Sequence, residues 1–133
     1  MVRSNQRTVS AIEKAGLLPA AQTRYYNRML DFSNLSKQER QSVREAWHVD
    51  ALDAFHDCDI VFVDPDNGLI VHSSEGTAKS NKFILPSELG DYYRQGSSVI
   101  YYQHKARRVD SFYVEQHNRL LSSGRFAVHL DLF

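Results

Sequence analysis

Residues 59–68, which read Asp-Ile-Val-Phe-Val-Asp-Pro-Asp-Asn-Gly, constrain the fold of this chain more than any other segment. An apolar run rich in β-branched residues ends abruptly in two carboxylates, an amide and a glycine. Such a run is typical of a strand that is buried on both faces inside a parallel sheet. In open α/β sheets, ligands bind just beyond the carboxyl ends of these strands. The sequence therefore predicts a site that contains Asp64, Asp66 and Asn67.

Length, charge and cysteine content set the limits for the rest of the chain. With 133 residues it has the length of one ordinary domain, and we expect residues 1–133 to form a single α/β domain. Its 16 basic and 16 acidic side chains cancel, which removes any overall attraction to nucleic acid or to a membrane. The lone Cys58 excludes an intrachain disulfide and a multi-cysteine zinc site, and we expect it to be a small core residue. Because we find neither a long apolar run nor an apolar leader, we expect a cytoplasmic protein without a transmembrane helix.

Helices and strands alternate along the predicted chain. Ser36 and Glu39 match a capping box that opens a long amphipathic helix. Its apolar positions recur at three- and four-residue spacing: Val43, Ala46, Trp47, Ala51, Ala54 and Phe55. The other predicted helices cover residues 5–15, 86–94 and 110–121. The predicted strands cover residues 60–63, 98–103 and 126–130, with a short extended piece over 23–26.

Strands that alternate with helices favour parallel pairing through right-handed crossovers. We therefore expect an α/β fold with a small, mainly parallel, three-layer sheet. Three strands are few for a doubly wound fold, which indicates an exposed sheet edge that is covered, paired with another subunit, or filled by sequence absent here. A homodimer through this edge is the partner that the pattern suggests.

The strands that end at Val63 and Gln103 would place their carboxyl ends together if they are parallel neighbours, because such strands lie about 5 Å apart. Asp64, Asp66 and Asn67 would then face His104. The predicted catalytic residues are Asp64, Asp66, Asn67 and His104. The predicted substrate-binding residues are Lys82, Glu88, Gln103 and Arg107, with Lys82 and Arg107 as anchors for an anion.

Three chemistries suit this group. Asp64 and Asp66, with His104 or Glu88, could hold a divalent cation such as Mg²⁺ or Mn²⁺, because hard cations prefer oxygen ligands. The Asp64–Asn67 segment could instead bind an amine-bearing substrate through its side-chain and backbone acceptors. General base catalysis by His104 or Asp66 is the third alternative.

A plain turn is the competing interpretation of residues 64–68, because proline, Asp, Asn and Gly are all strong turn formers. The basic cluster Lys105, Arg107 and Arg108, interleaved with tyrosines, could bind nucleic acid or form a solvated loop. The chain contains no G-x-G-x-x-G, Walker A or G-x-S-x-G segment, so a ligand would not be held by those loops.

The chain also resembles an uncharacterised family of bacterial and phage proteins of roughly double this length. The resemblance covers most of the chain. Its most specific mark is the segment from Asp59 to Leu69, and further matches are Arg7–Glu13 leading into Gly16–Pro19, and Ser98–His104 followed by Arg107-Arg108. It implies a Rossmann-type fold similar to methyltransferases, with this chain corresponding to the C-terminal half. The N-terminal part of the family would supply the first strand and the glycine loop that hold S-adenosylmethionine.

The leading functional hypothesis is therefore a transferase-like site that acts on nucleic acid or a nucleotide. S-adenosylmethionine or a metal ion is a candidate cofactor. One alternative is a metal-dependent hydrolase or nuclease that uses Asp64, Asp66, Glu88 and His104. The other is a non-enzymatic interaction domain that associates through its open sheet edge.

Overall fold

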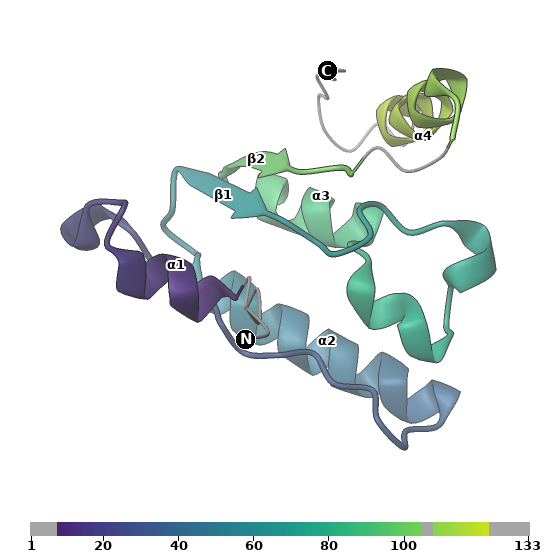
Figure 1. The fold of residues 1–133 in the computed structure, drawn as a ribbon, viewed down its shortest axis with the longest axis horizontal. Helices are drawn as coiled ribbons and strands as arrows, with labels where there is room; N and C mark the ends of the chain where they lie inside the picture. Colours follow the sequence, from purple (N-terminus) through teal and green to yellow (C-terminus); the bar gives the residue numbers. More distant parts are fainter. Residues whose placement is uncertain (1–7, 105–107, 123–133) are drawn as a thin grey trace, which may run out of the picture.

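The computed structural model describes residues 8–104 and 108–122, and its ribbon mixes helices with a small parallel sheet (Figure 1). The principal elements are α1 (Val9–Ala15), α2 (Lys37–Ala54), β1 (Ile60–Val63), α3 (Pro86–Arg94), β2 (Ser98–Tyr101) and α4 (Asp110–Ser122). Short 3₁₀ helices, η1 (Ala20–Gln22), η2 (His72–Ser74) and η3 (Ala78–Lys82), lie in the connections. The predicted α/β class is confirmed. The predicted strand over residues 126–130 lies outside the described residues, and residues 23–26 form no strand.

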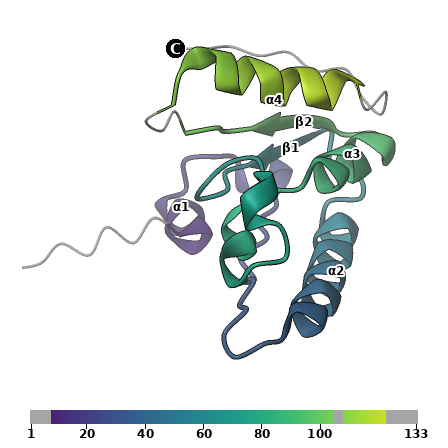
Figure 2. The same cartoon turned by 90° about the vertical axis from the view of Figure 1, so that its right-hand side faces the viewer.

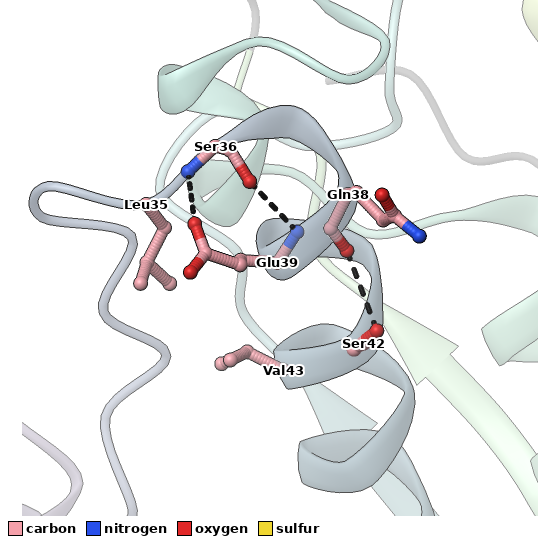
Figure 3. Close-up of a pocket in the computed structure, with 6 residues that line it drawn as sticks. All are labelled: Leu35, Ser36, Gln38, Glu39, Ser42 and Val43. Carbon is pink, nitrogen blue, oxygen red and sulfur yellow. Dashed lines mark hydrogen bonds between the residues drawn. The ribbon is translucent and has the colours of Figure 1, made fainter.

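Local sequence signals determine where the helices begin and end. Thr8 caps α1 by accepting a hydrogen bond from the Ala11 N–H, and Gly16 follows the helix in the left-handed conformation with φ 62°. The predicted capping box of α2 is confirmed: Ser36 N–H donates to Glu39 Oε2 at 2.7 Å, and Glu39 N–H donates to Ser36 Oγ at 3.3 Å (Figure 3). These bonds satisfy amide groups that a helix start otherwise leaves unpaired.

The buried face of α2 differs from the predicted apolar stripe. Its buried residues are Arg44, His48 and Ala51, whereas Val43 and Ala46 are exposed. The helix is therefore rotated so that two polar side chains point inward. They can be buried because carboxylates of α3 and main-chain carbonyls of the preceding loop provide their hydrogen-bond partners.

Arg44 makes the most extensive of these contacts. Its Nε donates to Glu88 Oε1 at 2.6 Å and its Nη2 to Glu88 Oε2 at 2.8 Å, which is a bidentate ion pair. The remaining donors reach the carbonyl oxygens of Ser80 at 2.8 Å and Phe83 at 2.7 Å. Glu88 also accepts the Leu85 N–H at 2.9 Å. One guanidinium thus joins α2 to the loop around η3 and to the start of α3.

The sheet consists of β1 and β2 in parallel, with Ile60 opposite Ser98 and Val63 opposite Tyr101. Helix α3 connects the two strands. Helix α4 lies on the β2 side of the molecule, and α2 lies at the opposite end (Figures 1 and 2). No third strand is present in the part of the chain that the structure describes.

One face of the sheet packs against the core and the other is exposed. Val61 is 4% exposed, and Val63, Val99 and Tyr101 pack against the two core clusters around Leu89 and Tyr92. On the other face, Ile60 is 61%, Phe62 63% and Ile100 54% exposed. The prediction that the 60–63 strand is buried on both faces is therefore wrong, because no described element covers the even-numbered side chains.

Replacing Arg44 with Met should lower the free energy of unfolding by about 3–5 kcal/mol, because Glu88 would remain buried without its countercharge. Arg28→Met breaks an exposed ion pair with Asp50 and should cost no more than about 1 kcal/mol. Urea unfolding followed by circular dichroism measures both. A loss below about 1 kcal/mol for Arg44→Met would contradict the assigned role.

Tyr92 should make stability depend on alkaline pH. Burial, followed by the nearby Glu88 carboxylate, raises the pKa of Tyr92 above the ordinary 10.0. The contribution of Tyr92 to the free energy of unfolding is fully present below pH 10. It falls above that value, because the unfolded chain then releases a proton that folded Tyr92 retains. Tyr92→Phe should reduce the slope of this loss by up to about 1.4 kcal/mol per pH unit.

Unfolding measurements from pH 8 to 11 check this expectation. Tyr102→Phe, at a tyrosine that is 50% exposed, is the matched control and should leave the slope unchanged. An unchanged slope in Tyr92→Phe would refute the link between Tyr92 and alkaline unfolding.

Candidate functional site

Asp64 and His104 lie at the carboxyl ends of β1 and β2. The ladder continues one step past the strands, since Tyr102 N–H donates to Val63 O at 2.9 Å, so both side chains leave the same sheet edge. His104 Nε2 lies 3.9 Å from Asp64 Oδ1, and the two side chains are 49% and 56% exposed. The His104 ring also packs edge-on against Tyr102, with centroids 4.7 Å apart. A carboxylate and an imidazole are thus placed side by side, open to solvent.

The segment from Asp64 to Gly68 forms a tight turn. Gly68 N–H donates to Pro65 O at 3.3 Å, and Gly68 has φ 79°, which a residue with a side chain rarely adopts. Asn67 N–H donates to Lys82 O at 2.9 Å, which ties the turn to the end of η3. The turn interpretation of this sequence and the site interpretation are therefore compatible, because the turn itself presents Asp64.

Gln103 fastens this turn to β2. Its Oε1 accepts the Leu69 N–H at 2.8 Å, and its Nε2 donates to His104 O at 3.2 Å. A Cβ on Gly68 would lie 2.2 Å from Gln103 Oε1, so only glycine leaves room for the amide. Gln103, predicted as a substrate-binding residue, thus bonds to the main chain of Leu69, directly after the turn, and to that of His104.

The other predicted site residues lie in different places. Asp66, Asn67 and the Lys82 side chain are exposed around the turn. Glu88 is buried and its carboxylate is taken up by Arg44 and the Leu85 N–H, so we leave it out of the site. Arg107 lies outside the described residues.

The described residues form no binding site for either candidate cofactor, a metal ion or S-adenosylmethionine. Among the described residues, no group of three or more His, Cys, Asp or Glu side chains is placed to hold a metal ion, so Asp64, Asp66, Glu88 and His104 do not assemble as one set of ligands. S-adenosylmethionine would need an open backbone cradle. The space beside Gly68 is filled by Gln103 and that beside Gly76 by Lys37, whose Cε would lie 2.8 Å from an added Cβ. The space beside Gly16 and Gly96 is open, but these glycines follow α1 and α3, whereas the glycine loop of a Rossmann-type fold follows a strand. The described residues therefore do not fit either group, and we assign no step to them.

Sequence reasoning missed a cleft of about 970 Å³ between α2, the start of α3 and the loop around residues 72–76. Arg44 and His48 line it from α2, and Glu88 and Asp91 from α3. His48 Nε2 lies 2.9 Å from Asp91 Oδ2. The sequence does contain a signal for this cleft. Two basic residues stand four positions apart on α2, and two acidic residues that face them stand three positions apart on α3. Its charged groups are largely paired with each other, which indicates a structural role.

A second hollow, of about 630 Å³, lies at the beginning of α2 (Figure 3). Three of its polar residues, Ser36, Glu39 and Ser42, are hydrogen-bonded at the helix start itself. It therefore offers fewer free groups to a ligand than the Asp64–His104 pair does.

Comparison of the chain with protein-family models, with curated proteins and with solved structures found no match in any of the three. In the described parts of the chain, no helix combines the length and the apolar character that a membrane crossing requires. Any function of this chain must therefore be inferred from the geometry of the site.

Gly68→Ala should destabilise the protein by about 1–3 kcal/mol, because it strains the backbone at positive φ and displaces Gln103 from the Leu69 N–H. In a Gln103→Ala background the same change should cost only the backbone strain, about 1 kcal/mol. A double-mutant cycle by urea unfolding measures the difference. Equal costs in the two backgrounds would show that Gln103 does not occupy this position.

Proposed function

We propose that the carboxyl ends of β1 and β2 form a transferase-like site that binds the amine-bearing base of a nucleotide or nucleic acid. The observation that carries the proposal is the pairing of Asp64 with His104 at 3.9 Å, both half exposed, on neighbouring parallel strands. Ligands bind at this edge of open α/β sheets. Within the described part of the chain, these two side chains contact each other and the Tyr102 ring, so a ligand would not have to break another hydrogen bond of theirs.

The chemistry of the pair suits an amine. The Asp64 carboxylate accepts hydrogen bonds from an exocyclic amine and so orients its nitrogen. When this nitrogen attacks the electrophilic atom of a group donor, His104 accepts the proton that the amine loses. The leaving group departs with the bonding electrons, and the Asp64 carboxylate compensates the charge on the imidazolium. Gln103 holds the turn and the His104 main chain in register during these steps.

A Rossmann-type fold is part of the same proposal. A parallel pair of strands joined through α3 supports a Rossmann-type arrangement related to the C-terminal half of a methyltransferase-like fold. The exposed apolar face of the sheet supports it as well, because parallel sheets are usually covered on both faces.

Phosphate recognition is supported by two exposed basic side chains, those of Lys82 and Arg108. Lys82 is exposed at the end of η3, whose main chain bonds to the turn at Asn67. Arg108 is exposed beyond His104 and lies over the Phe112 ring at 4.5 Å. These cations suit a ligand that carries both a base and a phosphate.

Adenosine and cytidine monophosphates should raise the midpoint of thermal unfolding, whereas uridine monophosphate, which lacks an exocyclic amine, should raise it much less. A ligand at about 100 times its Kd adds about 2.7 kcal/mol, which corresponds to a shift of several degrees. Asp64→Asn should remove the preference for the amine-bearing nucleotides, because an amide nitrogen replaces one carboxylate oxygen.

The control is a second exposed pair of the same kind. His72 Nδ1 lies 3.5 Å from Glu75 Oε2, and the variant Glu75→Gln should leave the nucleotide shifts unchanged. Equal shifts with all three nucleotides, or equal effects of Asp64→Asn and Glu75→Gln, would refute the proposed site.

A further inference from the structure

A narrow gap separates the polar atoms of Asp64 and His104. Asp64 Oδ1 and His104 Nε2 lie 3.9 Å apart, which is too far for a hydrogen bond between them. A donor nitrogen placed between the two atoms would reach both at about 2.9 Å, the ordinary length of a hydrogen bond. An ionised carboxylate only accepts hydrogen bonds, and a neutral imidazole accepts at one of its nitrogens. The gap therefore suits a group that donates two hydrogens from a single nitrogen.

Tyr102 holds the His104 side of this gap. The two rings stand nearly perpendicular at 82°, with centroids 4.7 Å apart, which is a favoured packing of two flat rings. Tyr102 N–H donates to Val63 O at 2.9 Å, so Tyr102 itself is held by the β1–β2 ladder. Gln103 Nε2 donates to His104 O at 3.2 Å and restrains the main chain as well. The imidazole is thus held in place although it is half exposed.

The strand end and the turn hold the Asp64 side. Asp64 directly follows Val63, the last residue of β1, and precedes Pro65, which restricts the backbone of the residue before it. Gly68 N–H donates to Pro65 O at 3.3 Å and closes the turn. Within residues 8–104 and 108–122, no donor is hydrogen-bonded to the Asp64 carboxylate. Both sides of the gap are therefore restrained, and the carboxylate is open to a ligand.

We propose that Asp64 Oδ1 and His104 Nε2 bind the two hydrogens of one primary amine between them, and that Tyr102 is the positioning residue that keeps the gap at this width. This inference rests on the function proposed above and adds that the substrate amine is primary. When the amine nitrogen attacks the group donor, the hydrogen that faces Nε2 moves to Nε2, and the electron pair of the broken N–H bond stays on the amine. The product is a secondary amine with one hydrogen, so it leaves one acceptor unpaired. The site therefore favours a single transfer to each amine.

Nucleotides that differ in the hydrogens of their amine test the gap. Adenosine monophosphate carries two hydrogens on its exocyclic nitrogen, its derivative methylated there carries one, and the dimethylated derivative carries none. We expect the shift in the midpoint of thermal unfolding to fall at each step. The affinity should fall at least about tenfold from the first to the last, because each missing hydrogen leaves an acceptor without its partner.

Variants of Tyr102 separate this geometry from a simple effect of the size of the methyl group. Tyr102→Phe keeps the ring and should keep the discrimination among the three nucleotides, whereas Tyr102→Leu removes the ring and should weaken it. Tyr102 is half exposed, so circular dichroism should show both variants folded. His72→Gln, in the exposed pair with Glu75, is the control and should change nothing.

Nitrogen NMR adds a reading that a purely structural role would not change. Adenosine monophosphate should displace the Nε2 signal of His104, because this atom accepts a hydrogen bond from the amine, and should leave the His72 signals in place. An undisplaced Nε2 signal, or full discrimination in Tyr102→Leu, would overturn the proposal. So would equal shifts with adenosine monophosphate and its methylated derivative; if both exceed the shift with uridine monophosphate, the function proposed above still stands. A chain that responds to no nucleotide would contradict both proposals.

Discussion

The bidentate pair between Arg44 and Glu88 is the interaction on which the arrangement of this fold depends. It lies between α2 and α3, where the Arg44 and Glu88 side chains are 9% and 4% exposed, and the same guanidinium also binds the carbonyls of Ser80 and Phe83. A buried ion pair gains little net stability over an apolar pair of similar volume, because both charges lose their hydration. The pair constrains geometry more than it adds stability, since all of these acceptors must lie in one plane around the Arg44 guanidinium.

A short series of contacts connects the Arg44–Glu88 pair to the candidate site. Arg44 fixes the loop around η3 and the first turn of α3, and Lys82 O in that loop binds Asn67 N–H in the Asp64–Gly68 turn. Helix α3 leads directly into β2, whose register against β1 places His104 beside Asp64. The position of the exposed pair therefore follows from a buried pair, Arg44 and Glu88, that precedes His104 in sequence.

Local sequence signals predicted those parts of the molecule that depend on near neighbours. The capping box at Ser36, the extent of β1 and the turn after Val63 each rest on bonds or steric limits within a few residues. The proximity of Asp64 and His104 was predictable because it needs only a parallel pairing of two strands. The buried face of α2 was not, since the apolar spacing of Val43 and Ala46 contains no information about Glu88, which lies 44 residues beyond Arg44 in sequence.

Burial of the strands was predicted incorrectly for a related reason. An apolar run such as Ile60–Val63 shows that both faces of a strand can be buried, but the element that covers each face comes from elsewhere. Val61 finds its cover in α2 and α3, whereas Phe62 remains 63% exposed. The apolar side chains of Ile60, Phe62 and Ile100 therefore remain uncovered among the described residues.

The Nε–H of Arg44, observed by NMR, tests the central claim most directly. If Arg44 holds α2, the η3 loop and α3 together, this proton donates to Glu88 in a buried site. It should then give a resolved signal that exchanges slowly with water at neutral pH and shows nuclear Overhauser contacts to Glu88. The exposed Arg119, which pairs with Glu115 within α4, provides the reference for fast exchange. An Arg44 signal that exchanges as fast as that of Arg119, without contacts to Glu88, would contradict the account.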